Sequence, residues 1–176
     1  MSDPNKGMTR AQVQFDCHGQ AVGKMRNDLN VYMKQPFEEG PFELATDEGS
    51  FHGGDASAPP PLALFVGGLT GCIMTQIRAF AKRMNVSMND LRVDTRVVWD
   101  WEAKDRIYET APHSFEIDVL IDSDDDDEKV IALIEAAKKG CFIEQTLGRP
   151  NTIRHRMKRR ASGDGEKSGD EIWVEV

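Results

Sequence analysis

The residues with the clearest capacity for chemistry are two cysteines, Cys72 and Cys141, each of which follows a glycine in the motifs "GGLTGC" and "AKKGC". A cysteine within an apolar stripe is more often a small buried side chain than a reactive group. Two thiols can also reduce a peroxide: one is oxidised to a sulfenic acid, and the other condenses with it to a disulfide. The pattern alone leaves both alternatives open.

Metal binding is a weaker alternative. Cys17 and His18 are adjacent, but the sequence contains no Cys-x-x-Cys and no His-x-x-x-His spacing. The acidic run at 124–127 lacks the glycine and the final glutamate of an EF-hand loop, and it is better interpreted as the first turn of a helix. We therefore expect no metal and no cofactor.

The basic segment at 149–160 ("RPNTIRHRMKRR") is the other concentration of charge. The formal net charge of the chain is −8, with 22 basic and 30 acidic residues, which disfavours nucleic acid or an anionic membrane as a partner. We interpret the segment as the solvated face of an edge strand. His52 and His113 have no motif around them, and on this basis each is expected to be a surface or hydrogen-bonded histidine and not a catalytic one.

The elements that must position the cysteines include a long helix at 61–84. Prolines mark its start, and apolar residues recur at three- and four-residue steps. Its first half is apolar nearly all round, which predicts burial on every side. Gly67, Gly68 and Gly71 lower helix propensity, so we expect another backbone to pass close to them.

A second helical segment at 123–147 carries Cys141. It opens with an N-cap and an acidic first turn, and Gly140 is expected to kink or divide it. The predicted apolar face of this segment consists of Val130, Ile131, Ile134, Ala137 and Cys141.

Alternating segments predict strands in the rest of the chain. Two lie near the N-terminus ("AQVQF" and "LNVYM"), separated by a turn-like stretch that contains Cys17. Residues 34–61 are expected to be mostly loop. Strands at 91–103 and 113–122 would be joined by a loop at 104–112, and a last hairpin would pair "TIRHRMK" with "EIWVEV". The order is βββ, helix, ββ, helix, ββ, which predicts an α+β protein with antiparallel pairing.

Length and composition indicate one domain over residues 1–176, with residues 1–10 as a disordered N-terminal tail. The N-terminus lacks the apolar core of a signal peptide, and the longest apolar run, at 62–74, is too short to span a bilayer. We expect a cytoplasmic protein without a membrane partner, whose three cysteines are kept reduced unless a pair cycles.

The order of these motifs resembles the OsmC/Ohr superfamily of osmotically induced and organic hydroperoxide resistance proteins. The resemblance runs from about residue 12 to the end, in "RNDLNVYMKQP", in "HGGDASAPPPLALFVGGLTGC", in the strand pair and in "AAKKGCFIEQTL". It implies antiparallel sheets wrapped around two central helices in an intertwined homodimer, with the site at the subunit interface.

The resemblance also implies a function: reduction of organic hydroperoxides, with Cys72 as the attacking thiol, Cys141 as the resolving thiol and an external dithiol as reductant. Two family features are missing. A glutamate is expected at Leu62 or Ala63, and an arginine near His52. Arg26 and then His52 are the candidates to supply the cation that activates Cys72.

A third departure is Phe142, which stands where the family commonly has proline after the second cysteine. These departures leave an alternative function open. The chain could instead be a noncatalytic OsmC-like protein that binds a small hydrophobic ligand at the dimer interface while its cysteines stay reduced.

Overall fold

The structure is a computed structural model of the 176-residue chain, and it describes residues 9–158 and 174–176. It is an α+β fold with antiparallel pairing, as the sequence predicts. The elements in chain order are β1 (Gln14–Ala21), β2 (Asn27–Gln35), β3 (Glu39–Thr46), the 3-10 helix η1 (Ser50–His52), α1 (Pro61–Met84), β4 (Asp90–Lys104), β5 (Ile107–Asp122), α2 (Asp127–Gly140), α3 (Phe142–Leu147), β6 (Arg156–Met157) and β7 (Val174–Glu175).

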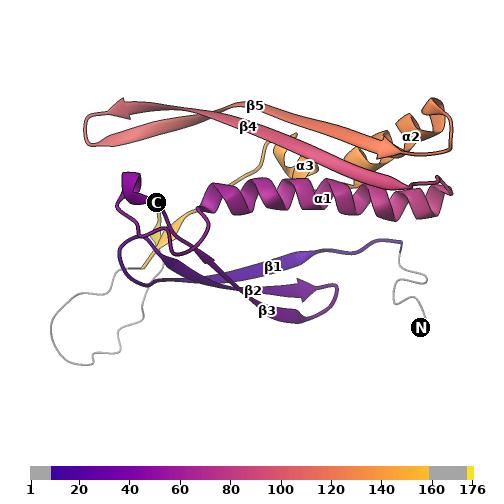
Figure 1. The fold of residues 1–176 in the computed structure, drawn as a ribbon. Coiled ribbons are helices and arrows are strands. Elements are labelled where there is room, and N and C mark those ends of the chain that lie inside the picture. The colour runs from indigo at the N-terminus through magenta and orange to yellow at the C-terminus, as the bar shows by residue number, and fades with distance from the viewer. Residues whose placement is uncertain (1–8, 159–173) are drawn as a thin grey trace, which may run out of the picture.

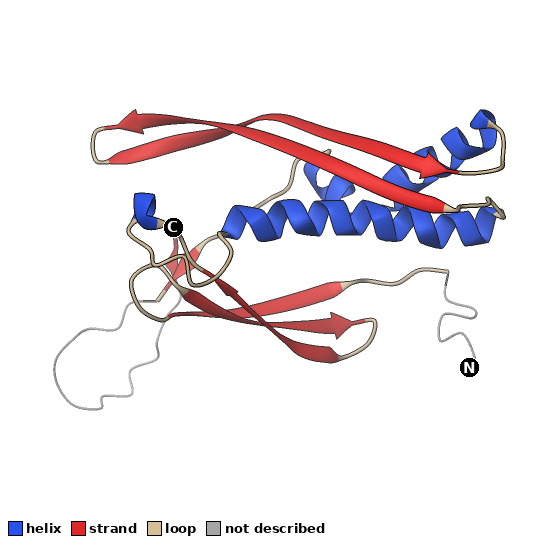
Figure 2. Cartoon of the chain, viewed as in Figure 1, coloured by secondary structure: helices blue, strands red, loops and turns tan. Residues whose placement is uncertain are grey.

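Helix α1 lies at the middle of the arrangement, with the β4–β5 hairpin on one side and the three-stranded sheet β1–β2–β3 on the other (Figures 1 and 2). Within the chain α1 packs against α2, α3 and β4. No comparable packing joins α1 to the three-stranded sheet among the described residues. One face of the central helix is therefore covered by the chain's own elements, and the other is not.

The bounds of α1 agree with the sequence prediction because both ends carry strong signals. Pro61 occupies the first helical position, where its missing N–H breaks no hydrogen bond. At the other end Asn85 adopts the left-handed conformation, with φ of 52°, and its backbone N–H donates to the Ala81 carbonyl. Lys82 and Arg83 in the last turn complement the negative end of the helix dipole.

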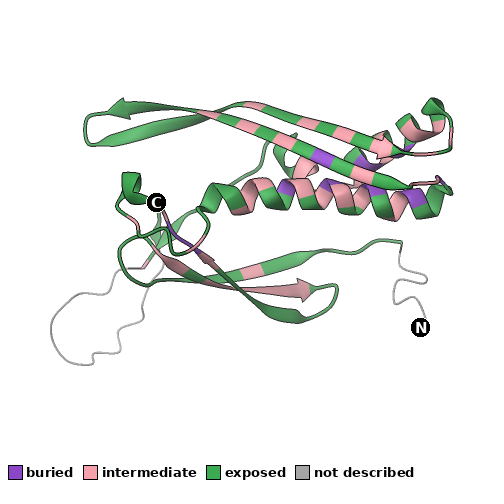
Figure 3. Ribbon diagram, in the orientation of Figure 1, coloured by how far each residue is buried: buried purple, intermediate pink, exposed green. Residues whose placement is uncertain are grey.

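The hydrophobic core is small and lies where α1 meets α2 and β4 (Figure 3). Its α1 residues are spaced four apart, so they form a single buried stripe. The buried hydrophobic residues are Leu69, Ile73, Ile77, Ala81, Val86, Val93, Leu133, Ala137 and Cys141. The site of the two cysteines is thus an extension of the core.

The division of the second helical segment at Gly140 is confirmed: α2 ends there, and α3 begins after Cys141. A Cβ at Gly140 would lie 2.6 Å from Cζ of Phe80, so the close packing of α1 on α2 requires glycine. Asp126 is the N-cap of α2, and its side chain accepts a hydrogen bond from the Lys129 backbone N–H. The placement of Ile131 on the buried face was wrong, because its side chain is 61% exposed.

The β4–β5 hairpin is longer than predicted, and the loop expected at 104–112 is wrong. Strand β5 begins at Ile107, so only Asp105 and Arg106 form the turn. Asp105 has a φ of 54°, a conformation that aspartate tolerates better than most residues. Cross-strand contacts outweigh the polar composition of this stretch: Trp101 packs edge-on against Tyr108, with ring centroids 5.9 Å apart.

Two N-terminal expectations are also corrected. Residues 34–61 are not mostly loop, because β3 pairs antiparallel with β2. Cys17 does not lie in a turn: it is in β1, opposite Val31 of β2, and is exposed. Glycine and proline composition predicted loops here, whereas the backbone hydrogen bonds of the three-stranded sheet determine the structure.

The first half of α1 is not buried on all sides within the chain. Leu62 is exposed, and space is open where side chains at Gly67 and Gly71 would stand. The nearest atom to such a side chain at Gly68 is a methyl carbon of Ile143, 3.6 Å away, and not a backbone. The close backbone expected from the glycines is therefore absent from the described part of the chain.

By length and composition, α1 is long and apolar enough to cross a membrane. This differs from the expectation based on the run at 62–74, because the helix continues to Met84. A single helix of this kind is weak evidence of a membrane span, since the central helix of a soluble protein passes the same test.

The last predicted hairpin is confirmed only in part: β6 pairs with β7, but within the strand expected at 152–158 only Arg156 and Met157 are in a strand. Part of it, with Arg159 and Arg160, lies outside the described residues, as does most of the predicted N-terminal tail. Arg149 does not belong to this strand; its guanidinium donates to the Gln145 side chain at the end of α3.

We predict that the protein is a homodimer, because the uncovered face of α1 and the exposed apolar residues Phe15 and Phe42 on the three-stranded sheet need cover that this chain does not supply. Sedimentation equilibrium at micromolar concentration should give a mass about twice 19.7 kDa. A stable, folded monomer under these conditions would contradict the prediction.

Candidate active site

The packing of α1 on α2 brings Cys72 and Cys141 together. Cys72 is half-buried on α1, and Cys141 is fully buried at the junction of α2 and α3. The Cys72 side chain packs against the core cluster that contains Cys141, and both residues are free thiols. Cys17 is also a free thiol, but it lies on the exposed surface of β1.

The two thiols have different environments. Burial raises the pKa of Cys141 to about 11, and a hydrogen bond from the Glu144 backbone N–H opposes this shift. The contact with Cys72 and the negative charge of Glu144 raise the pKa further. At neutral pH Cys141 is therefore a protonated thiol, and Cys72, the more exposed member of the pair, is the one that an external molecule can reach.

Glu144 is a functional candidate that the sequence analysis missed. It lies one turn of α3 beyond Cys141, and its Oε2 is buried without a hydrogen-bond partner among the described residues. Desolvation raises the pKa of its carboxyl above the usual value, with Lys138 lowering it and Glu135 raising it. The available signal was a single acidic residue within the apolar run "CFIEQTL".

A pocket of about 750 Å³ opens between α1, the β4–β5 hairpin and the α2–α3 segment. Its aromatic wall contains Trp99, which packs edge-on against Phe65 at 5.9 Å and Phe115 at 6.3 Å between ring centroids. Leu69, one turn before Cys72 on α1, and Glu144 also line it. The pocket therefore has an aromatic wall on the hairpin side and a charged wall on the α2–α3 side, which consists of Glu135, Lys138, Lys139 and Glu144.

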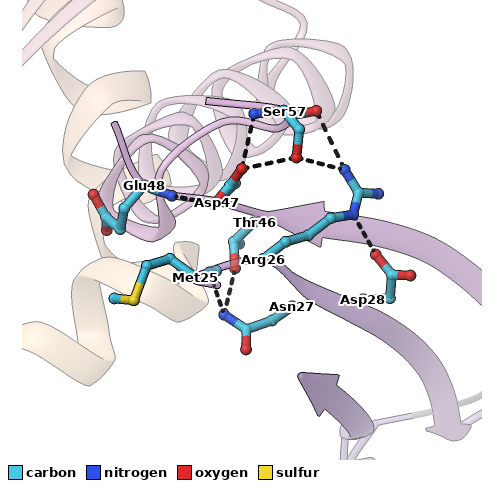
Figure 4. A network of polar contacts seen from close by, with 8 residues as sticks. All are labelled: Met25, Arg26, Asn27, Asp28, Thr46, Asp47, Glu48 and Ser57. Carbon is cyan, nitrogen blue, oxygen red and sulfur yellow. Dashed lines mark hydrogen bonds and ion pairs between the residues drawn. The ribbon is translucent and has the colours of Figure 1, made fainter. Parts of the chain in front are cut away.

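Arg26 belongs to a polar network that holds the loop between β3 and α1 (Figure 4). Its guanidinium donates to Oγ of Ser57 at 3.1 Å and to the Ser57 carbonyl at 3.3 Å, and it pairs with Asp28 at 2.9 Å. Ser57 in turn donates its hydroxyl to Asp47 at 2.8 Å. Asp47, Ser57 and Arg26 therefore form a chain of hydrogen bonds from a buried carboxylate to a half-buried cation.

Asp47 organises this loop. It is only 2% exposed, and its carboxylate accepts from the backbone N–H groups of Ser57 and Glu48 as well as from the Ser57 hydroxyl. The hydrogen bonds from Ser57, foremost the one from its backbone, lower the pKa of Asp47. The Asp47 backbone N–H donates to the Pro59 carbonyl, so the loop is closed just before α1.

His52 lies at the end of η1, edge-on against Phe51 at 4.8 Å between ring centroids. It lines a second apolar pocket, of about 510 Å³, with residues that include Leu62, Trp101 and Tyr108. None of the contacts described for residues 9–158 joins Arg26 or His52 to Cys72 of the same chain. The fold thus brings the two cysteines together and leaves both candidate cations elsewhere in the single chain.

The structure contains no group of three or more His, Cys, Asp or Glu side chains suited to a metal ion within the residues that it describes. His113 pairs with Asp100 at 2.9 Å on the β4–β5 hairpin. The sequence pattern assigned no role to a metal or to His113.

We predict that Asp47→Asn destabilises the protein near neutral pH and lowers Tm by several degrees. The pKa of Asp47 is lowered in the folded state, which means that folding stabilises its carboxylate form. The contribution is present above the unfolded pKa of 3.8 and is lost as the pH falls through the lower folded value. Urea unfolding of the wild type and of Asp47→Asn across this pH range measures the contribution of Asp47 to stability. The control Asp55→Asn removes an exposed ion pair with Lys24 and should change little.

We predict the opposite pH dependence for Glu144→Gln. The pKa of Glu144 is raised in the folded state, so the wild type loses stability relative to this variant as the pH rises from 4.5 through the folded pKa. Urea unfolding of both proteins between about pH 5 and pH 8 should show a difference that grows with pH in favour of the variant. A constant difference over this range would contradict the desolvation of the carboxyl.

Comparison with known proteins supports one family. The family model described as OsmC-like protein matches residues 53–156, more than half of the chain. No curated protein matches. Among solved structures, the chain is similar to an OsmC-like hydroperoxide resistance protein from Jannaschia sp. CCS1, with 59% identity, a TM-score of 0.60, and coverage of 95% of this chain and 100% of that one.

Two more distant structures share the fold. An OsmC-like protein from Mycoplasma pneumoniae is 16% identical, with a TM-score of 0.58 and coverage of 77% of this chain and 87% of that one. An organic hydroperoxide resistance protein from Elizabethkingia anophelis, with thiocyanate bound, is 15% identical, with a TM-score of 0.53 and coverage of 79% and 89%. On the family match and the 59% identity over almost the whole length, this chain belongs to the OsmC-like protein family.

Proposed function

We propose that the protein is a soluble, cytoplasmic enzyme that reduces organic hydroperoxides with the thiol pair Cys72 and Cys141. The observation that carries the proposal is the contact between these two thiols, which come from separate helices and differ in exposure. The family gives further support, since the 59% identical Jannaschia protein is named a hydroperoxide resistance protein. Neither cysteine lines the pocket of about 750 Å³, but its lining includes Leu69 and Glu144, which lie one turn from Cys72 and Cys141, and its aromatic wall suits the organic group of such a substrate.

In the first step the Cys72 thiolate attacks the distal oxygen of the hydroperoxide. The O–O bond breaks, the alkoxide takes a proton and leaves as an alcohol, and Cys72 becomes a sulfenic acid. Cys72 suits this role because it is the more exposed thiol of the pair, whereas Cys141 is fully buried and protonated at neutral pH.

In the second step Cys141 attacks the Cys72 sulfur, the S–O bond breaks, and water leaves as the disulfide forms. An external dithiol then exchanges with this disulfide and restores both thiols. The net reaction converts a hydroperoxide and a dithiol into an alcohol, water and an oxidised dithiol. Neither a metal nor another cofactor is needed in this scheme.

The attacking thiol needs a nearby positive group, and Arg26 and His52 remain our candidates in that order. In the single chain the Arg26 guanidinium is directed to Ser57 and Asp28. The three-stranded sheet that carries Arg26 is not packed on α1 of the same chain. We therefore expect the cation to approach Cys72 from the second copy of a homodimer, in which that sheet covers the open face of α1.

A noncatalytic role is the second candidate, because the second apolar pocket, lined by Leu62, Trp101 and Tyr108, could hold a small hydrophobic ligand without thiol chemistry. The two functions differ in what happens to the cysteines. A binding protein would keep them reduced in the presence of a peroxide, whereas the enzyme would link them.

We predict that cumene hydroperoxide links Cys72 to Cys141 and leaves Cys17 as a free thiol, because only the first two side chains are in contact. Peptide mapping of the treated protein measures this directly. Cys17→Ser is the matched control and should consume peroxide like the wild type, whereas Cys72→Ser should lose at least about 99% of the activity because the attacking atom is gone.

The outcome that rejects the enzyme is equally clear. If the mapped protein contains no disulfide, or one that includes Cys17, and Cys72→Ser consumes peroxide at the wild-type rate, the two-cysteine mechanism fails. The binding function would then replace it.

A further inference from the structure

Glu144 has an environment that its structural role does not explain. Its Oε2 is buried and has no hydrogen-bond partner among the described residues, in the wall of the apolar pocket. Leaving a buried carboxylate oxygen without a partner is unfavourable, and such groups in native proteins often mark a functional site. The backbone N–H of Glu144 donates to the Cys141 thiol. The residue that carries the carboxyl therefore also holds the Cys141 side chain in place.

The charged groups around this carboxyl are few. On α2, Lys138 and Glu135 face it, with Lys139 nearby, and Lys138 is already paired with Glu135 at 2.7 Å. Among the described residues, the Cys141 thiol is the other titratable group that interacts with this carboxyl. The pocket residues of α1, β4 and β5 carry no titratable side chain: Phe65, Leu69, Trp99, Thr110, Pro112, Phe115 and Ile117.

We propose that Glu144 is the acid–base residue of the second step, in which Cys141 forms the disulfide. This inference rests on the proposed thiol chemistry. The Glu144 carboxylate takes the proton from the Cys141 thiol, directly or through one water molecule, and the resulting thiolate attacks the Cys72 sulfur. The S–O bond of the sulfenic acid breaks, and Glu144 returns the proton to the departing hydroxide, which leaves as water.

The step needs such a base because of where Cys141 lies. Burial and the neighbouring groups keep it protonated at neutral pH, so few molecules would carry the thiolate spontaneously. Glu144 can accept the proton because its Oε2 has no hydrogen-bond partner among the described residues, whereas Glu135 is engaged by Lys138. Desolvation also raises the pKa of the Glu144 carboxyl, which brings it closer to that of the thiol.

The experiment isolates the attack of Cys141 from the peroxide. In a Cys17→Ser background, 2,2′-dithiodipyridine first forms a mixed disulfide on the accessible Cys72 and releases one thiopyridone. Attack by Cys141 then releases the second. Stopped-flow absorbance resolves the two phases in the parent, in Glu144→Gln and in the control Glu116→Gln, which removes an exposed carboxylate of β5 that pairs with Arg96 and does not line the pocket.

We expect Glu144→Gln to leave the first phase unchanged and to slow the second at least about tenfold. In the parent the second phase should accelerate as the pH rises through the ionisation of Glu144, and the variant should lack this part of the profile. Glu116→Gln should behave like the parent in both phases.

A purely electrostatic role gives the opposite sign. The charge of Glu144 raises the pKa of Cys141, so removing it would favour the thiolate and make the second phase faster. A second phase in Glu144→Gln that equals or exceeds the parent rate, with the parent pH profile, overturns the proposal.

A parallel arm with cumene hydroperoxide separates this inference from the proposed function. Dimedone should trap more Cys72 sulfenic acid in Glu144→Gln than in the parent, because the first step proceeds and the second is slowed. If the parent forms neither sulfenic acid nor disulfide with the peroxide, the proposed function fails, while the dithiodipyridine phases still decide the role of Glu144.

Discussion

The close packing of α1 on α2 is the contact on which the rest of this structure depends. Ile73 and Ile77 of α1 meet Leu133 and Ala137 of α2 in the core, and replacing one of the large members by alanine would cost about 2–5 kcal/mol. Gly140 makes the approach possible, because any side chain there would collide with Phe80. The same contact sets the distance between the two helices that carry the cysteines.

That packing also creates the chemical asymmetry of the site. Cys141 ends α2 inside the core, where burial keeps its thiol protonated, while Cys72 lies on the less covered side of the stripe on α1. Glu144 follows Cys141 into the same desolvated region and lacks a partner for one oxygen. The packing of these helices therefore brings together two thiols and a carboxyl that differ in burial and come from distant parts of the chain.

The N-terminal half has a different organising group. The buried carboxylate of Asp47 holds Ser57, and Ser57 holds Arg26, so the loop that enters α1 is fixed to the three-stranded sheet. This sheet does not pack on α1 of its own chain, and it exposes large apolar side chains such as Phe15 and Phe42. A second copy of the chain is the occupant that would cover both surfaces.

The sequence by itself determined the α+β class, the limits of α1, the break at Gly140 and the pairing of β4 with β5, because each depends on signals local to the chain. It predicted three N-terminal strands but did not locate the third, β3, and it missed the full length of β5 and the position of Cys17, since cross-strand hydrogen bonds overrode the loop-like composition. Only the tertiary structure packed Cys72 against the cluster that contains Cys141 and buried Oε2 of Glu144. Proximity and desolvation arise when distant helices pack, and no local pattern of residues encodes them.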